Sequence, residues 1–168
     1  VGFVVHLNYK NPFLSPFDEF QRMKLHPDVR KHLEGGKRIS YGARAITEGG
    51  WQSVPKVSFP GGALIGCSAG FVNVPRIKGS HNAMKTGMLA AEAAFAALQH
   101  GAPSNGLDSY ENGWRKSWVG KDLKLVRNVK PLWSKLGTYI GIPLGALDMW
   151  FNTLFAGLSP FSGFGSLK

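Results

Sequence analysis

Hydrophobic and polar positions follow one another along residues 56–100 in the order of a short strand, a long loop and a helix. The apolar run Ala63-Leu64-Ile65 lies between glycines and predicts a buried strand. From about His81 the apolar positions recur every three or four residues, which predicts an amphipathic helix that Ser80 caps and Gly101 ends. The expected apolar face of this helix comprises Met84, Met88, Ala91, Phe95 and Leu98.

This strand–loop–helix unit has two features that favour an anion. Gly66 follows the strand directly, so that backbone can turn there or be approached closely. The helix N-terminus adds free N–H groups and the positive end of the helix dipole. A phosphate or a reduced flavin ring fits such a place. A plain packing unit without a ligand has the same pattern, so the spacing alone leaves both interpretations open.

The first 59 residues are expected to form strands around two short helices. Strands are predicted at 1–9, 36–46 and 51–59, the last two joined by the hairpin-like turn Thr47-Glu48-Gly49-Gly50. Ser15, Pro16 and Asp18 predict the start of a helix, which His26-Pro27 interrupts before a second short helix at 28–33. The apolar side of the first helix fits either core packing or the wall of an apolar ligand tunnel, and carries Phe17, Phe20 and Met23.

Residues 107–128 are expected to be mostly helical, although Gly113 and Gly120 weaken that prediction. Between residues 115 and 135 there are seven basic side chains and one acid, Asp122. Such a run is either a solvated helix face or a surface that attracts an anionic partner. The apolar anchors of this segment are Tyr110, Trp114, Trp118 and Leu125.

Residues 136–158 contain one charged side chain, Asp148, and are long enough to span a bilayer, which takes about 20 apolar residues. Pro143, the glycines and the charge near the middle argue against a span. A helix lying in the membrane interface beside the basic run fits best, and a buried core helix and a true span are the alternatives. The expected apolar stripe comprises Leu136, Ile140, Leu144, Leu147, Phe151, Leu154 and Leu158.

Composition narrows the classes of function. The formal net charge is +10, which attracts nucleic acid, acidic proteins or an anionic membrane. A single cysteine, Cys67, excludes a disulfide framework and an all-cysteine metal site within the chain. No acid–base pair or activated nucleophile stands out. The chain starts at Val1 as if a strand were under way, and no G-x-G-x-x-G precedes the strand–loop–helix unit, so we expect a piece of a longer protein.

The run GCSAGFVNVPRIKGSHNAMKTGMLAAE resembles the last flavin-contacting segment of FAD-dependent enzymes of the glutathione-reductase and hydroxylase type. Most of these carry Gly-Asp where this chain has Gly66-Cys67. That departure, together with NPFLSPFDEFQRMKLHP, EGGKRISYGARAITEGGWQSVPK and FPGGALIGC, is similar to the electron transfer flavoprotein–ubiquinone oxidoreductase family. The resemblance covers Val1 to about Val129 and continues more loosely to the C-terminus.

The resemblance implies a mixed α+β or α/β fold. It predicts a fragment of a glutathione-reductase-type FAD-binding fold, with an inserted antiparallel-sheet quinone-binding domain and a C-terminal helical membrane-associated segment. Residues 1–58 would belong to the quinone-binding domain, and 59–106 would form the closing strand–loop–helix of the FAD domain. Residues 107–168 would be the helical segment with its basic flank. A first FAD-binding segment is expected upstream and an iron–sulfur segment downstream.

The resemblance also implies a cofactor site. The backbone at Gly66-Cys67 would approach the ribityl–pyrophosphate of FAD, and Gly79-Ser80-His81 would place helix N–H groups near the flavin pyrimidine edge. A thiol near a helix N-terminus is a candidate for reactivity, but after an apolar strand Cys67 is expected to be buried and inert. The predicted FAD-contacting residues are Gly66, Cys67, Gly70, Asn73, Pro75, Gly79, Ser80, His81 and Asn82.

By resemblance, the expected reaction passes electrons from reduced electron transfer flavoprotein through FAD and a [4Fe–4S] cluster to ubiquinone. The cluster ligands are expected outside this chain, and no nucleic acid is expected as a partner. The protein would lie on one side of an inner membrane, on the mitochondrial matrix side or the bacterial cytoplasmic side. The alternatives are another FAD-dependent lipid reductase or hydroxylase, and a basic non-catalytic module that binds membrane or nucleic acid.

Overall fold

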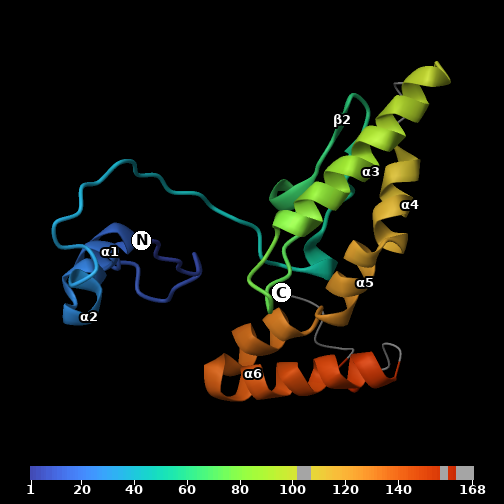
Figure 1. Cartoon of the computed structure of the whole chain (residues 1–168). Coiled ribbons are helices and arrows are strands. Elements are labelled where there is room, and N and C mark those ends of the chain that lie inside the picture. The colour runs from blue at the N-terminus through green and yellow to red at the C-terminus, as the bar shows by residue number, and fades with distance from the viewer. Residues whose placement is uncertain (102–106, 156–158, 162–168) are drawn as a thin grey trace. The chain divides into compact units, whose positions relative to one another are not determined.

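The computed structural model describes residues 1–101, 107–155 and 159–161, which divide into two compact units, Val1–Arg44 and Ala45–Lys168. Most of the regular structure is helical (Figure 1). Among the described residues one sheet is present, formed by β1 (Ser58–Phe59) and β2 (Gly62–Ala63) as an antiparallel pair. The helical segments of the expected mixed fold are therefore present, with far less sheet than predicted.

The N-terminal unit contains α1 (Pro16–Leu25) and α2 (Pro27–Arg30). The helix start predicted at Ser15 is confirmed, because the Ser15 hydroxyl accepts a hydrogen bond from the Asp18 N–H at 3.3 Å. The interruption at His26-Pro27 is confirmed as well, and the His26 ring accepts from the Asp28 N–H at 3.3 Å. Local capping chemistry was sufficient to predict these two helices.

The strands expected at 1–9 and 36–46 are wrong for the described residues, which have no strand in the N-terminal unit. The strand expected at 51–59 is mostly wrong, because Trp51–Ser53 is a 3-10 helix, η1, and pairing begins only near Val57. The Leu64 N–H donates to the Val57 carbonyl at 2.8 Å, which extends the β1–β2 hairpin by one pair. A strand needs a neighbour for its backbone groups, and apolar composition does not supply one.

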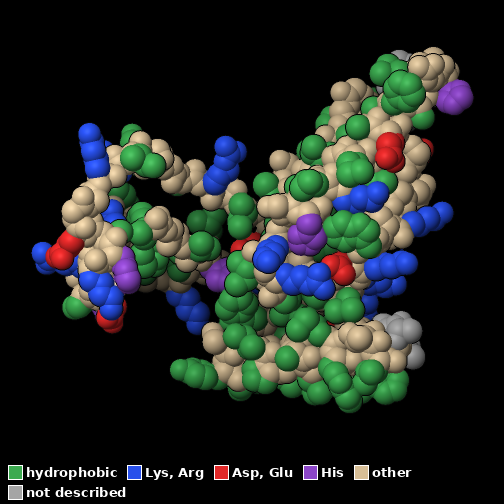
Figure 2. Space-filling model, in the orientation of Figure 1, with side chains coloured by type: hydrophobic (Ala, Val, Ile, Leu, Met, Phe, Trp, Pro, Cys, Tyr) green, Lys and Arg blue, Asp and Glu red, His purple; other side chains and the backbone are tan. Residues whose placement is uncertain are grey.

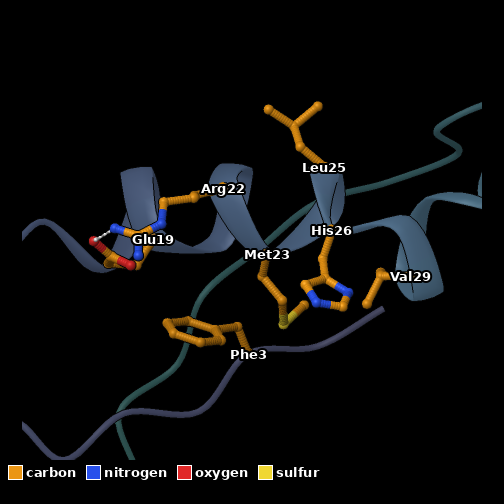
Figure 3. Close-up of a pocket in the computed structure, with 7 residues that line it drawn as sticks. All are labelled: Phe3, Glu19, Arg22, Met23, Leu25, His26 and Val29. Atoms are coloured by element: carbon orange, nitrogen blue, oxygen red, sulfur yellow. Dashed lines mark hydrogen bonds and ion pairs between the residues drawn. The ribbon is translucent and has the colours of Figure 1, made fainter.

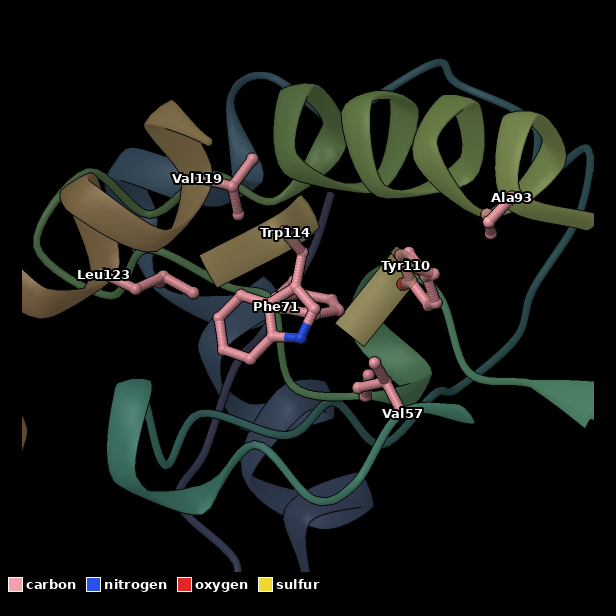
Figure 4. Packing of buried hydrophobic residues seen from close by; sticks show 9 residues of the cluster. Val57, Phe71, Ala93, Tyr110, Trp114, Val119 and Leu123 are labelled. Atoms are coloured by element: carbon pink, nitrogen blue, oxygen red, sulfur yellow. The ribbon is translucent and has the colours of Figure 1, made fainter. Parts of the chain in front are cut away.

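The core of the C-terminal unit lies where α3 (Ser80–Gln99), α4 (Asp108–Lys116) and α5 (Trp118–Leu125) meet the β1–β2 hairpin. Trp114 is fully buried, and its ring lies edge-on to Phe71, with centroids 4.9 Å apart (Figure 4). The Tyr110 hydroxyl donates to the Leu64 carbonyl at 2.8 Å, and burial raises the pKa of this phenol to about 12. Two of the four predicted apolar anchors, Tyr110 and Trp114, are therefore confirmed as core residues. Trp118 is 43% exposed.

The helix predicted from about His81 is confirmed as α3, but its predicted buried face is wrong. Met84, Met88, Phe95 and their neighbours on that stripe are exposed in the described chain. The buried residues of α3 are Asn82, Thr86, Ala90 and Ala93. Small and polar side chains lie inward because the loop after β2 packs closely against this side of the helix.

The last helix, α6 (Val129–Leu154), is two helical segments joined at Gly137, whose φ of 73° breaks the helix. The second segment folds back against the first, as Figure 1 shows. Gly141 makes this possible, since a Cβ there would lie 2.6 Å from the Leu132 carbonyl oxygen. In the residues the structure describes, no helix combines the length and apolar character needed to cross a membrane.

Candidate functional site

A tight glycine turn begins the long loop that connects β2 to α3. Gly66 has a φ of 56°, a conformation that strongly favours glycine, and its N–H donates to the Thr86 hydroxyl at 3.1 Å. Its carbonyl accepts from the Phe71 N–H at 3.1 Å. A Cβ at Gly66 would lie 2.9 Å from that of Ala83 in the first turn of α3. The glycine therefore lets the loop lie directly against the start of the helix, as the sequence predicted.

The N-terminus of α3 lacks a side-chain cap. Gly79 occupies the cap position, and the prediction that Ser80 caps the helix is wrong by one residue, since Ser80 is its first residue and is exposed. The first N–H groups of an α-helix have no acceptor within the helix, and no cap side chain serves them here. They form a place that favours negative charge or a carbonyl oxygen.

Two buried asparagines lie beside this helix start. The side-chain amide of Asn82 donates to the Phe71 carbonyl at 3.1 Å, and the Asn73 N–H donates to the Lys78 carbonyl at 3.0 Å. The remaining amide atoms, Asn73 Nδ2 and Asn82 Oδ1, are buried without a hydrogen-bond partner among the described residues. Buried polar atoms usually have partners, so these two atoms are exceptions beside the helix start.

His81 lies at the same helix start. Its ring stacks on Trp118 of α5, with centroids 5.5 Å apart and an interplanar angle of 6°. The His81 Nε2 atom is buried and has no hydrogen-bond partner in the described part of the chain. The stacking fixes the plane of the His81 ring at the start of α3.

Among the predicted site residues, Cys67 departs most from expectation. The prediction that its thiol is buried is wrong, because Cys67 is exposed in the described chain. It lies in the 3-10 turn η2 (Gly66–Ser68), which buries Gly66 and the following Ala69 while Cys67 and Ser68 face outward. Gly70 is buried with a φ of 85°, and Pro75 is half-buried in the next loop.

The loop between Asn73 and Gly79 has a strained tip that sequence reasoning missed. Ile77 is 90% exposed and has a φ of 51°, which is unusual for a β-branched residue. The Ile77 N–H donates to the Val74 carbonyl at 2.9 Å, and an isolated bridge pairs Asn73 with Lys78 below it. The hairpin-like closure fixes the tip beside α3. The residues between Asn73 and Lys78 match no recognisable turn motif, so the sequence carries no signal for this closure.

The N-terminal unit contains an open pocket of about 420 Å³ (Figure 3). Phe3 and Met23 supply apolar surface, and the His26 ring lies next to Met23. The Phe3 ring also stacks on Phe20, with centroids 6.1 Å apart. The Glu19–Arg22 ion pair, at 3.3 Å, lies at one end. Mixed apolar and polar lining is typical of a site that holds an apolar molecule with a polar head.

The second segment of α6 is apolar on its exposed side and polar or small on its buried side. Gly141, Gly145, Asp148 and Asn152 are buried. The exposed side forms a hydrophobic surface along α6, as Figure 2 shows. Its large members are Tyr139, Ile140, Ile142, Leu147, Trp150 and Leu154. The predicted stripe is partly confirmed: Leu144 and Phe151 are half-buried, and Leu158 lies outside the described residues.

The basic run from residue 115 to 135 is partly neutralised within the chain. Arg115 pairs with Glu111 at 2.8 Å, and Lys130 lies 3.8 Å from Glu48. Asp122, the one acid of the run, pairs with Arg76 at 3.1 Å. The exposed basic side chains of the run include Lys116, Lys121, Lys124 and Lys135. A positive surface remains, although it is weaker than the composition alone predicts.

A comparison with known proteins first identifies the class of protein that this chain resembles. Residues 1–46 match the family model described as "ETF-QO, ubiquinone-binding", a range that nearly coincides with the N-terminal unit. The chain is 53% identical over 168 residues to the mitochondrial electron transfer flavoprotein-ubiquinone oxidoreductase of Bos taurus. It is 52% identical over 162 residues to that of Oryza sativa and 50% identical over 177 residues to that of Dictyostelium discoideum.

These alignments cover 96% of this chain but only 27–28% of the relatives, so the chain spans about a quarter of their length. The chain is a homologue of a segment of electron transfer flavoprotein-ubiquinone oxidoreductase, which confirms the family predicted from its motifs. The activity of the whole enzyme is carried by a polypeptide several times longer than this segment.

Proposed function

We propose that this chain is the quinone-binding, flavin-contacting and membrane-facing part of an oxidoreductase that passes electrons from reduced electron transfer flavoprotein to ubiquinone. The observation that carries the proposal is the inverted polarity of α6, which buries Asp148 and Asn152 and exposes a continuous apolar side. Ubiquinone has a long polyprenyl tail and stays in the bilayer, so its reductase must reach the membrane surface. A helix with an outward apolar side suits that task.

The site at the start of α3 fits FAD. Asn73 Nδ2 offers a buried donor, and the uncapped N–H groups from Ser80 to Asn82 favour the negative charge of a reduced flavin. The backbone at Gly66-Cys67 is proposed to face the ribityl–pyrophosphate, for which side-chain burial of Cys67 is not needed. The proposed contacts are Gly66, Cys67, Gly70, Asn73, Pro75, Gly79, Ser80, His81 and Asn82.

When bound, FAD would accept electrons from the donor protein and release them toward the quinone. The residues of this chain would position the cofactor and bias its charge state. A [4Fe–4S] cluster needs several thiolates, and this chain has only Cys67, so the cluster ligands are proposed to lie outside it. The described residues hold no group of three or more His, Cys, Asp or Glu side chains able to bind a metal ion.

The pocket of the N-terminal unit is the proposed contact for ubiquinone. It lies within the residues that match the ubiquinone-binding family model. Phe3 and Met23 would contact the apolar part of the quinone, and His26 would lie near its polar head. We assign residues 1–58 to the quinone-binding domain, 59–106 to the FAD domain and 107–168 to the membrane-associated segment. The mitochondrial or bacterial inner membrane is the proposed location, with the protein on one side.

The test is single-turnover kinetics with the full-length protein. Reduced electron transfer flavoprotein should bleach the absorbance of the bound flavin at about 450 nm. Ubiquinone in vesicles should then restore that absorbance. A protein without flavin, or one whose reduced flavin is not reoxidised by ubiquinone, would refute the proposal. Reoxidation by water-soluble quinone but not by vesicle-bound ubiquinone would refute the membrane part alone.

A further inference from the structure

Asp148 is a charged residue in an otherwise apolar segment, and it is completely buried. It is the only charged side chain between residues 136 and 155. Its relative exposure is 0%, whereas the nearby Leu147 and Trp150 are 42% and 56% exposed. Removing a carboxylate from water is costly unless hydrogen bonds compensate it. The position of Asp148 therefore requires a specific set of partners.

Those partners come from separate parts of the chain. The Asn128 amide donates to Asp148 Oδ1 at 3.0 Å, and the Asn152 amide donates to Asp148 Oδ2 at 2.9 Å. The Ser159 hydroxyl also donates to Oδ1. The Asn152 amide donates in addition to the Leu125 carbonyl at 3.2 Å. The carboxylate thus joins the residue before α6, the C-terminal turns of α6 and the segment after it, and Asn152 extends the network to the end of α5.

Packing specifies the rotation of this helix only in part: a Cβ at Gly141 would lie 2.6 Å from the Leu132 carbonyl oxygen, so the glycine side is the one that can face the first segment. Besides Asp148 and Asn152, the buried residues of the second segment are Gly141 and Gly145, whose small surfaces allow close contact but offer no side chain to interlock. Large apolar residues on the exposed side would gain from turning inward. Directional hydrogen bonds to a buried carboxylate oppose that rotation, because turning Asp148 outward would leave the Asn128 and Asn152 amides without their acceptor.

We propose that Asp148 is a positioning residue that fixes the rotation of α6 about its axis, and so determines which side of the helix contacts lipid. This inference rests on the proposed membrane contact and goes beyond it, since an apolar helix can bind a membrane in several orientations. Buried polar groups are known to specify one arrangement among several in this way, at a cost in stability. Asn128 and Asn152 act through Asp148 and share the role.

The structure indicates that Asp148→Asn is a suitable conservative control for Asp148→Leu. Asn128 Oδ1 and Asn152 Oδ1 are both buried without a partner in the described chain. In Asp148→Asn, one of these amides can rotate and accept from the new amide group, so the network is largely kept. In Asp148→Leu the volume is similar but every acceptor is lost. The pair separates the hydrogen-bonding role of the side chain from its size.

The experiment uses full-length protein on vesicles of phosphatidylcholine with cardiolipin. A photoreactive phenylalanine analogue replaces either Trp150, on the exposed side, or Met149, which is half-buried at its edge. In the wild type we expect lipid cross-linking at 150 to exceed that at 149 by about tenfold, as for an interfacial helix in one orientation. Asp148→Leu should reduce that ratio to about twofold, and Asp148→Asn should keep it within about a factor of two of the wild type.

A ratio that Asp148→Leu leaves unchanged would overturn the inference, even if the melting temperature fell, since a purely structural role lowers stability without changing orientation. If Asp148→Leu does not fold, Asn152→Leu removes one partner of the carboxylate, and an unchanged ratio in that variant overturns the inference equally. No lipid cross-linking at either position in the wild type would instead refute the proposed membrane contact, and the inference with it.

Discussion

Two acidic substitutions on the exposed side of α6 should release the protein from membranes. Ile140 and Leu147 are 58% and 42% exposed, and neither packs in the core of the C-terminal unit. Ile140→Asp with Leu147→Asp therefore changes the proposed lipid contact and leaves the buried network around Asp148 in place. Control substitutions of the same charge are available in α4, where Ser109 and Asn112 are exposed.

The expected loss of membrane-binding free energy follows from the exposed fractions of Ile140 and Leu147. A fully buried Leu or Ile side chain contributes about 1.5–3 kcal/mol, so two that are half exposed contribute about 2 kcal/mol when lipid covers them. Each new carboxylate held near the interface costs on the order of 1 kcal/mol more, below the cost at the bilayer centre. The sum of about 4 kcal/mol corresponds to a roughly thousandfold lower partition coefficient.

The assay is sedimentation of the full-length protein with vesicles at rising lipid concentration, followed by quinone reductase activity. We expect the double variant to stay in the supernatant, to lose turnover with vesicle-bound ubiquinone and to keep flavin reduction by the donor protein. The control variant, Ser109→Asp with Asn112→Asp, should bind like the wild type. Equal partitioning of the two double variants would contradict the assignment of this side of α6 to lipid.

Three further predictions concern the other parts of the chain. Gly79→Val should lower FAD content and shift the flavin potential, because a Cβ at this position already meets Val72 at 3.3 Å; full FAD content with an unchanged potential would contradict the proposed site. Stability should fall as the pH rises from 10 toward 12, because the raised pKa of Tyr110 means that the folded state holds its proton more tightly than the unfolded state, and Tyr110→Phe should remove that dependence in denaturant titrations between pH 9 and 12. Met23→Ser with Phe3→Ser should raise KM for ubiquinone by about tenfold with little change in flavin reduction, since each exchanges apolar contact surface for a hydroxyl; an unchanged KM would exclude this pocket as the quinone contact.

Local signals in the sequence predicted the helices well. The Ser15-Pro16 start, the break at His26-Pro27 and the extent of α3 all depend on residues close together in the chain. Capping hydrogen bonds and proline geometry act over a few residues, and so the sequence displays them directly. The glycine turn at Gly66 belongs to the same group, since its backbone conformation is the one that its residue type favours.

Properties that depend on distant neighbours were predicted less well. The strands expected in the N-terminal unit require partners that no local pattern specifies. The buried side of α3 was assigned to its large apolar residues, whereas close packing against the loop at Gly66 selects Thr86 and Asn82 instead. Cys67 was expected to be buried for the same reason, because an apolar run before it says nothing about the direction of the turn that follows.

The return of α6 upon itself at Gly137 has a consequence for the energetics of membrane attachment. Many peripheral helices are unfolded in solution and become ordered only on lipid, so part of the binding free energy is consumed by the loss of conformational freedom. Here Gly141 and Gly145 hold the second segment against the first within the protein itself. The proposed lipid-contacting surface is thus preorganised, and most of the free energy that its apolar area would gain on lipid would be available for attachment.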